Sequence, residues 1–173
     1  MAMRGIQLGL RVWQFVWTLL IMALIGNLIA EAISGNPATI NYVMFVSAFS
    51  MFTLLYLVPA SISPDWALHP ILPIVLDTLN MIFFLTSAIA LAARLECHSC
   101  SNEEYTLNNE ITNGSHNPQK RCREAQASTA FLWFAWAGYT ASWVLSILMS
   151  RQAGANLRPR VGPPRGRPSM AQV

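Results

Sequence analysis

Four long stretches of this chain are almost free of charge, and they constrain its fold more than any other feature. They are residues 12–30, 40–61, 71–93 and 125–150, and only the third contains a charged side chain, Asp77. The shortest has 19 residues, and a helix of that length covers ~28 Å, close to the thickness of a bilayer's hydrocarbon core. Because lipid offers no hydrogen-bond partners to the backbone, each stretch is expected to cross the membrane as a helix.

The composition excludes an ordinary soluble domain. Only 11% of the 173 residues are charged and 54% are hydrophobic, whereas soluble domains carry ~25% charged residues. The first stretch is longer than the apolar region of a secretory signal, about 7–15 residues, so it is kept as a span. The sequence therefore predicts an all-α membrane protein, in which residues 1–150 form a bundle of four transmembrane helices.

The basic residues indicate how the bundle is inserted. Four spans place both termini on one side, and short cytoplasmic segments carry an excess of lysine and arginine. The two termini carry seven arginines, whereas residues 94–124 carry four basic residues and five glutamates. Asn113 begins an Asn-Gly-Ser triplet in that segment, a candidate N-glycosylation acceptor. We expect cytosolic termini and an exoplasmic loop between the third and fourth spans.

Three cysteines, Cys97, Cys100 and Cys122, decide the chemistry of that loop. Together with His98 or His116 they supply four zinc ligands, although their spacing matches no compact zinc module. The exoplasmic side is oxidising and favours a disulfide instead. Three cysteines allow three pairings, of which Cys100–Cys122 would bracket the polar segment and contribute ~3–4 kcal/mol by the chain-entropy estimate.

A redox centre is the remaining interpretation of the loop. The Cys-x-x-Cys at residues 97–100 superficially fits a thiol–quinone oxidoreductase of the membrane surface, and His98 would help to lower a thiol pKa. Such enzymes generally relay electrons through a second cysteine pair, for which only Cys122 remains. The sequence alone leaves zinc, redox and disulfide interpretations open.

Asp77 is the only acid inside a predicted span, and an ionisable residue at membrane depth suggests a function. It lies six residues into the third span, ~9 Å along the helix. Asn80 and Ser87 share its helix face. Such a polar stripe favours contact with neighbouring helices over contact with a headgroup or ion. No second ionisable residue falls inside a predicted span, so a proton relay, and with it transport, is not expected.

The fourth span carries small residues on one face, Gly138, Ser142 and Ser146, each four residues after the last. Small residues let helix backbones approach closely. This face either closes the bundle or joins two protomers, and the sequence does not distinguish the two.

Residues 151–173 form a basic tail with five arginines, four prolines, three glycines and no acid. It cannot bury enough apolar surface to fold alone, and we expect a disordered cytosolic tail. Such a tail either binds anionic headgroups, at ~1 kcal/mol per basic residue, or only enforces topology; nucleic-acid binding is the least expected use. The arginines assigned to the lipid surface are Arg151, Arg158, Arg160, Arg165 and Arg167.

Four short motifs resemble one family. INYVMF begins the second span (residues 40–45), VLDTLN lies in the third (75–80), HSC opens the loop (98–100), and RCREAQA leads into the fourth span (121–127). In this order and spacing, over nearly the whole chain, they resemble the fungal non-classical export proteins, a family of MARVEL-domain membrane proteins.

The resemblance implies a non-enzymatic organiser of the plasma membrane, with no cofactor and no metal. Relatives are associated with furrow-like membrane compartments beneath which eisosomes assemble, with sphingolipid-responsive behaviour, and with export of proteins that lack signal peptides. The resemblance also implies that Cys100 and Cys122 form the loop disulfide, with Cys97 as an extra cysteine. It further implies that Asp77 and Asn80 belong to an intramembrane polar motif.

The resulting hypothesis is a self-associating scaffold that gathers lipids and proteins into a membrane compartment. Its expected partners are sphingolipid, sterol, anionic inner-leaflet lipid, further copies of the chain and other compartment proteins, with no nucleic acid. Gly138 and Ser142 would make the protomer contacts. The alternative is a small membrane thiol oxidoreductase or transporter that uses Cys97 and Cys100, or Asp77.

Overall fold

The structure of the protein is a computed structural model that describes residues 2–33, 35–63, 69, 71–96 and 98–152. Its four long helices are α1 (Ala2–Ala30), α2 (Ala38–Ile62), α3 (Ile71–Leu95) and α5 (Pro118–Gln152). A short helix, α4 (Glu103–Asn108), lies between α3 and α5. All four long helices are long and apolar enough to cross a membrane. The described residues contain no strand, so the prediction of an all-α bundle with four spans is confirmed.

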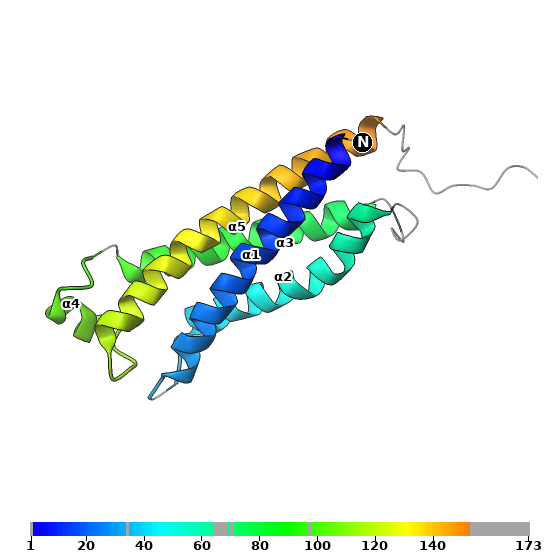
Figure 1. Cartoon of the computed structure of the whole chain (residues 1–173). Coiled ribbons are helices and arrows are strands. Elements are labelled where there is room, and N and C mark those ends of the chain that lie inside the picture. Colours follow the sequence, from blue (N-terminus) through cyan, green and yellow to red (C-terminus); the bar gives the residue numbers. More distant parts are fainter. Residues whose placement is uncertain (1, 34, 64–68, 70, 97, 153–173) are drawn as a thin grey trace, which may run out of the picture.

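The four long helices form an antiparallel bundle in which each helix packs against two others (Figure 1). Both α1 and α3 contact α2 and α5. Therefore α1 and α3 face each other across one diagonal of the bundle, and α2 and α5 across the other. The start of α1 lies beside the end of α5, which we call the terminal end, whereas α4 lies at the opposite end, the α4 end.

The first helix is longer than the apolar pattern predicted. It begins at Ala2 rather than at Val12 and has 29 residues, or ~43 Å, which exceeds a hydrocarbon core of about 30 Å. Arginine is a good helix former, so Arg11 continues the helix instead of ending it. Arg11 is 1% exposed and lies within the membrane-spanning helix. The expectation that no second ionisable residue falls inside a span is therefore wrong.

The interior of the bundle changes character along its length. Towards the α4 end it is apolar, where Ile21, Ile25 and Leu28 of α1 are fully buried with Phe84 and Leu91 of α3. Towards the terminal end the buried face of α1 becomes polar, and its side chains are Gln7, Arg11, Gln14 and Thr18. The outer surface carries exposed apolar side chains, as expected where lipid surrounds the helices.

The loop at the α4 end is closed by a disulfide between Cys100 and Cys122, the pairing that the family resemblance implied. Cys97 lies outside the described residues. Because both described sulfurs are bonded to each other, neither Cys100 nor Cys122 offers the thiolate that a zinc site needs. The redox interpretation required Cys100 to pair with Cys97, but Cys100 is bonded to Cys122 instead.

Next to the disulfide, Arg121 ties the loop to the first helix. Its Nε donates to the carbonyl of Ile111 at 2.6 Å, and its Nη1 donates to the carbonyl of Leu28 at 2.6 Å. Nearby, Lys120 pairs with Glu31 just beyond α1, and the hydrogen bond from Lys120 lowers the pKa of the Glu31 carboxyl. The α4 end is thus held by a covalent link and by charged contacts to α1.

Candidate functional site

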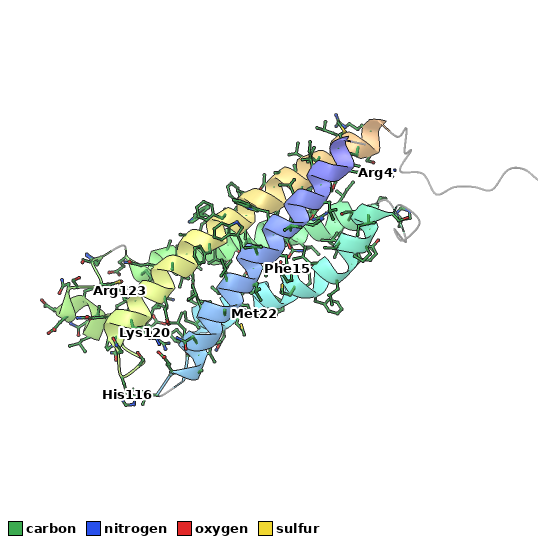
Figure 2. The ribbon with its side chains drawn as sticks, in the orientation of Figure 1. Arg4, Phe15, Met22, His116, Lys120 and Arg123 are labelled. Atoms are coloured by element: carbon green, nitrogen blue, oxygen red, sulfur yellow. A yellow bond between two sulfur atoms is a disulfide. The ribbon has the colours of Figure 1, made fainter. Side chains whose placement is uncertain are left out.

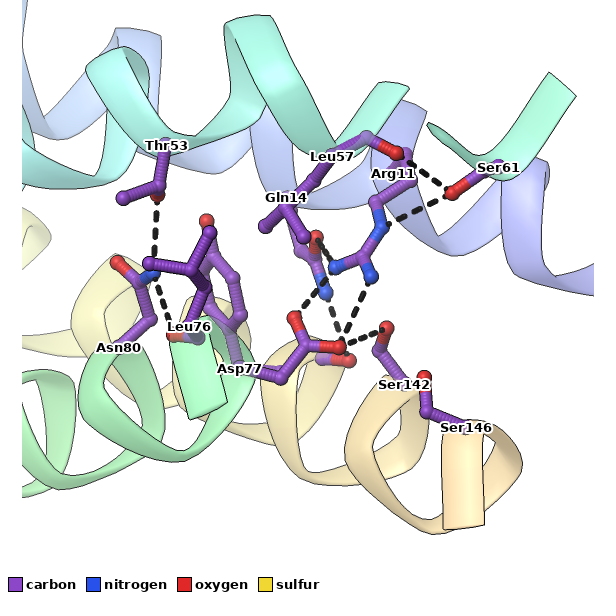
Figure 3. Close-up of polar contacts among 12 residues, drawn as sticks. Arg11, Gln14, Thr53, Leu57, Ser61, Leu76, Asp77, Asn80, Ser142 and Ser146 are labelled. Atoms are coloured by element: carbon purple, nitrogen blue, oxygen red, sulfur yellow. Dashed lines mark hydrogen bonds and ion pairs between the residues drawn. The ribbon is translucent and has the colours of Figure 1, made fainter. Parts of the chain in front are cut away.

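Asp77 is fully buried on α3, and its carboxylate is paired with Arg11 of α1 (Figure 3). Arg11 Nη1 lies 2.5 Å from Asp77 Oδ1, and Nη2 lies 2.9 Å from Oδ2. Two parallel N–H···O bonds of this kind are among the stronger charge-assisted hydrogen bonds in proteins. The pair joins α1 and α3 across a diagonal of the bundle.

The other two long helices complete the hydrogen bonding of this pair. Ser142 of α5 donates to Asp77 Oδ2 at 3.2 Å. Arg11 Nη1 donates to Gln14 Oε1 at 3.0 Å, and Arg11 Nε donates to Ser61 Oγ of α2 at 3.4 Å. All four long helices therefore meet at one point, which we call the ionic cluster: Arg11, Gln14, Ser61, Asp77 and Ser142.

Two glutamines bind α1 to the small-residue face of α5. Gln7 Nε2 donates to Ser142 Oγ at 2.7 Å and to Ser146 Oγ at 3.3 Å. Gln14 Nε2 donates to the backbone carbonyl of Gly138 at 3.1 Å. The three small residues singled out in the sequence thus all receive hydrogen bonds from α1 of the same chain.

Gly138 also allows the close approach of α1. A Cβ at this position would lie 2.7 Å from Cδ1 of Trp13, and Trp13 donates its indole N–H to the carbonyl of Phe134 at 3.1 Å. This face of α5 is therefore occupied within the chain. Gly138 and Ser142 are buried and do not offer the protomer contacts expected of them, because α1 already covers them.

A second polar layer lies next to the ionic cluster, farther from the terminal end. Asn80 Nδ2 donates to Thr53 Oγ1 of α2 at 2.9 Å (Figure 3). Ser50 Oγ lies 2.6 Å from Tyr139 Oη and 3.2 Å from Thr18 Oγ1. The contact between Ser50 and Tyr139 links α2 to α5, so polar contacts cross both diagonals of the bundle.

Burial determines what the ionic cluster can do chemically. Asp77 is 0% exposed and Arg11 is 1% exposed, so either charge alone would carry a large desolvation cost. Every nitrogen of the Arg11 guanidinium and both oxygens of Asp77 have a hydrogen-bond partner. A carboxylate held in this way is suited to fixing helices together. It could take up a proton or an ion only by giving up Arg11.

Two buried acceptors border these layers without a partner among the described residues: Gln7 Oε1 and Asn80 Oδ1. A buried water commonly satisfies atoms of this kind. Both belong to side chains whose amide nitrogens already bond across helices, so they lie inside the same polar interior and form no separate site.

The other residues singled out in the sequence lie away from the ionic cluster. Asn113 is exposed in a turn at the α4 end, and Arg151 is exposed at the end of α5. Their proposed roles in glycosylation and lipid contact stay predictions. Four more tail arginines lie outside the described residues: Arg158, Arg160, Arg165 and Arg167.

Arg11 is the site residue that the sequence interpretation missed, because it was assigned to the flank of the first span. A usable signal was present. Gln7, Arg11, Gln14 and Thr18 follow alternating steps of four and three residues that continue through Ile21, Ile25 and Leu28. That spacing marks one face of a helix, so the apolar face towards the α4 end places Arg11 on the buried side of α1.

Comparison with known proteins decides the family. The model of the MARVEL family, described as a membrane-associating domain, matches residues 2–145. The chain belongs to the MARVEL family. The matched region contains every residue of the ionic cluster and all four spanning helices except the last residues of α5. This MARVEL protein is accordingly a multi-pass membrane protein.

Similar proteins place it within the fungal non-classical export proteins, as the sequence motifs predicted. Non-classical export protein 102 of Candida albicans is 37% identical over 165 residues, which is 95% of each chain. Non-classical export protein 2 of Saccharomyces cerevisiae is 35% identical over 147 residues, 84% of this chain and 82% of the relative. Its homolog in Schizosaccharomyces pombe is 30% identical over 147 residues, 84% and 79% of the two chains. No solved structure matches this MARVEL protein.

Proposed function

We propose that this MARVEL protein is a non-enzymatic organiser of the plasma membrane that self-associates and gathers lipids and proteins into a compartment. One observation carries the proposal. The intramembrane carboxylate of Asp77 is neutralised by Arg11 and bonded to Ser142 inside the bundle. A carrier or an intramembrane enzyme that used the Asp77 carboxylate would need it to change its partners during each cycle, whereas a scaffold needs it to hold the helices in place.

In this proposal the buried polar contacts stabilise the bundle, and the outer surface and the two ends of the bundle make the functional contacts. The names of the relatives support a role in non-classical export. In our proposal that role follows from the compartment, a plasma-membrane furrow associated with eisosomes. The lipids gathered there are sphingolipid and sterol.

We infer an orientation with both termini in the cytosol. The disulfide between Cys100 and Cys122 lies at the α4 end, and disulfides persist on the oxidising, exoplasmic side. Exposure of Asn113 at the same end supports this orientation, since a glycosylation acceptor must face the exoplasmic side. The exposed Arg151 then lies on the cytosolic side, as the excess of basic residues there requires.

The proposal is tested in living cells. The full chain, fused to a fluorescent protein, is expressed in Saccharomyces cerevisiae that lacks Non-classical export protein 2. We expect it to concentrate in plasma-membrane patches that coincide with an eisosome marker, and to restore export of a protein without a signal peptide. A uniform distribution, or retention in internal membranes, would contradict the proposal.

A parallel measurement separates the scaffold from the transporter. Asp77→Asn and Arg11→Gln are compared at equal abundance in the same cells. If the protein is a scaffold, the number of membrane patches in each variant should fall only in proportion to the loss of folded protein. If Asp77→Asn abolished a transport activity while its abundance and location stayed normal, the transporter would be favoured.

A further inference from the structure

An apolar groove runs along the outside of the bundle between α1 and α2, next to the ionic cluster. Its volume is about 720 Å³. The two walls are formed by Leu8, Val12 and Phe15 of α1 and by Phe52, Leu55 and Pro59 of α2. Phe52 and Leu55 are 73% and 75% exposed, so the groove opens to the surroundings of the bundle. For a membrane-spanning helix pair, those surroundings are lipid.

The groove offers almost nothing to a polar ligand. Arg11 is the one lining residue with a charge, and its guanidinium is turned inward to Asp77, Gln14 and Ser61. The other lining side chains are hydrocarbon, aromatic or thioether groups. Removing a polar group from water without a hydrogen bond is unfavourable, so the occupant of this groove must be hydrocarbon.

Pro59 contributes to the shape of the groove. Proline has no N–H, so the carbonyl of Leu55 lacks its regular partner four residues later, and helices commonly bend at such a place. Pro59 lies inside α2, and Figure 1 shows α2 bending in its second half. A bend beside a straight neighbouring helix leaves a gap that neither helix fills.

An exposed cation stands at one end of the groove. Arg4 precedes Leu8 by four residues and Phe15 by eleven, which places all three on one face of α1. Arg4 lies ~6 Å from Leu8 along the helix axis, on the side of the terminal end (Figure 2). Arg4 forms no ion pair with any described residue and is exposed. Its charge is therefore available to a headgroup at the membrane surface.

We propose that the groove holds an acyl chain of an anionic glycerophospholipid, whose phosphate headgroup binds Arg4. The hydrocarbon chain suits the apolar walls, and the cation beyond Leu8 selects a negative headgroup. A second copy of the chain is the alternative occupant, and the Leu55→Trp variant below distinguishes it from a lipid.

The proposal goes beyond the proposed function, in which the gathered lipids are sphingolipid and sterol, by adding a bound anionic glycerophospholipid. It rests on that function only in taking the chain as a bilayer protein. The full chain is placed in nanodiscs of phosphatidylcholine, alone or mixed with phosphatidylserine. Native mass spectrometry then counts the lipids that stay bound after release. We expect one phosphatidylserine to be retained in preference to phosphatidylcholine by about five-fold, the effect of one basic residue near an anionic surface.

Two variants test the headgroup contact at Arg4 and the apolar groove separately. Arg4→Gln should abolish the preference for phosphatidylserine and leave one lipid of either kind bound. Leu55→Trp should fill the groove and lower retention of both lipids. The matched controls lie on α5: Arg123→Gln removes an exposed arginine of the α4 end, away from the groove, and Leu148→Trp enlarges an exposed apolar residue. Neither control should change retention.

Several outcomes would overturn the proposal. Equal retention of the two lipids, an unchanged preference in Arg4→Gln, or an equal loss in Arg123→Gln would each show that the groove does not select an anionic lipid. If Leu55→Trp dissociates oligomers and leaves lipid retention intact, a second copy occupies the groove. Should Leu55→Trp fail to fold, Leu8→Phe narrows the groove from α1. Patch formation in cells is scored separately, so a failed lipid assay leaves the organiser proposal standing.

Discussion

Removing one partner of the pair between Arg11 and Asp77 should destabilise the bundle severely. Asp77→Asn keeps the size of the side chain but leaves the guanidinium of Arg11 buried at 1% exposure without a counter-charge. Breaking a buried ion pair in this way costs ~3–5 kcal/mol. For a chain of 173 residues, each kcal/mol lowers Tm by roughly 2–4 °C. The expected loss is therefore about 6–20 °C.

The reverse variant, Arg11→Leu, should lose a comparable amount because it leaves the carboxylate of Asp77 with only the hydroxyl of Ser142. The double variant Arg11→Leu with Asp77→Leu removes both charges together, and it is compared with Arg11→Leu and Asp77→Leu as its two single variants. Replacing a whole buried pair by apolar side chains is often neutral. We therefore expect the double variant to be more stable than either single variant, a non-additivity of several kcal/mol that only directly coupled residues produce.

The assay is thermal unfolding of the full chain in detergent, followed by tryptophan fluorescence and by size-exclusion chromatography of the heated sample. The matched control is Arg94→Gln, which removes an exposed ion pair with Glu110 whose side chains are 58% and 53% exposed. Solvent screens such a pair, so it should change stability by no more than ~1 kcal/mol. Single variants as stable as this control, or a double variant that loses the sum of both singles, would refute the proposed coupling.

Two further predictions concern the packing of α5 and the loop. Gly138→Ala should lower the unfolding free energy by ~1–3 kcal/mol, the usual penalty of overpacking, because its Cβ would overlap Trp13. A Cβ at Gly26 would meet open space, so the control Gly26→Ala should not destabilise the protein. Thermal unfolding of both variants tests this difference. Peptide mapping of the unreduced protein should recover a linked peptide containing Cys100 and Cys122, and replacing both by serine should cost ~3–4 kcal/mol in thermal unfolding. A Cys122 that alkylates freely before reduction would contradict the observed pairing.

The spans were predictable because their signal is local. A long apolar stretch without charges can be recognised within a short window of the sequence. In lipid the backbone of such a stretch must satisfy its own hydrogen bonds, which a helix does. The disulfide followed from the family resemblance rather than from spacing, since three cysteines allow three pairings. Both predictions depend on residues that lie within one loop or one helix.

The ionic cluster was not predictable in the same way. Arg11 and Asp77 are 66 positions apart, and their helices face each other only once the bundle has closed. The charge of Arg11 marked an apparent end of the first span. The spacing of Gln7, Arg11 and Gln14 nevertheless placed Arg11 on the buried face of the helix. The role of Gly138 was undecided for a similar reason, because a small-residue face looks the same whether a helix of the same chain or of another copy covers it.

The distance in sequence between the partners of the ion pair also bears on biosynthesis. The ribosome makes Arg11 long before Asp77, so α1 meets the membrane while its arginine has no counter-charge. Arginine in the middle of an inserting helix costs ~2.5–3.5 kcal/mol on translocon-based scales, and less near the ends. The first helix is thus expected to settle at its final depth only after α3 has been synthesised. Insertion and folding of this bundle then proceed together, rather than one after the other.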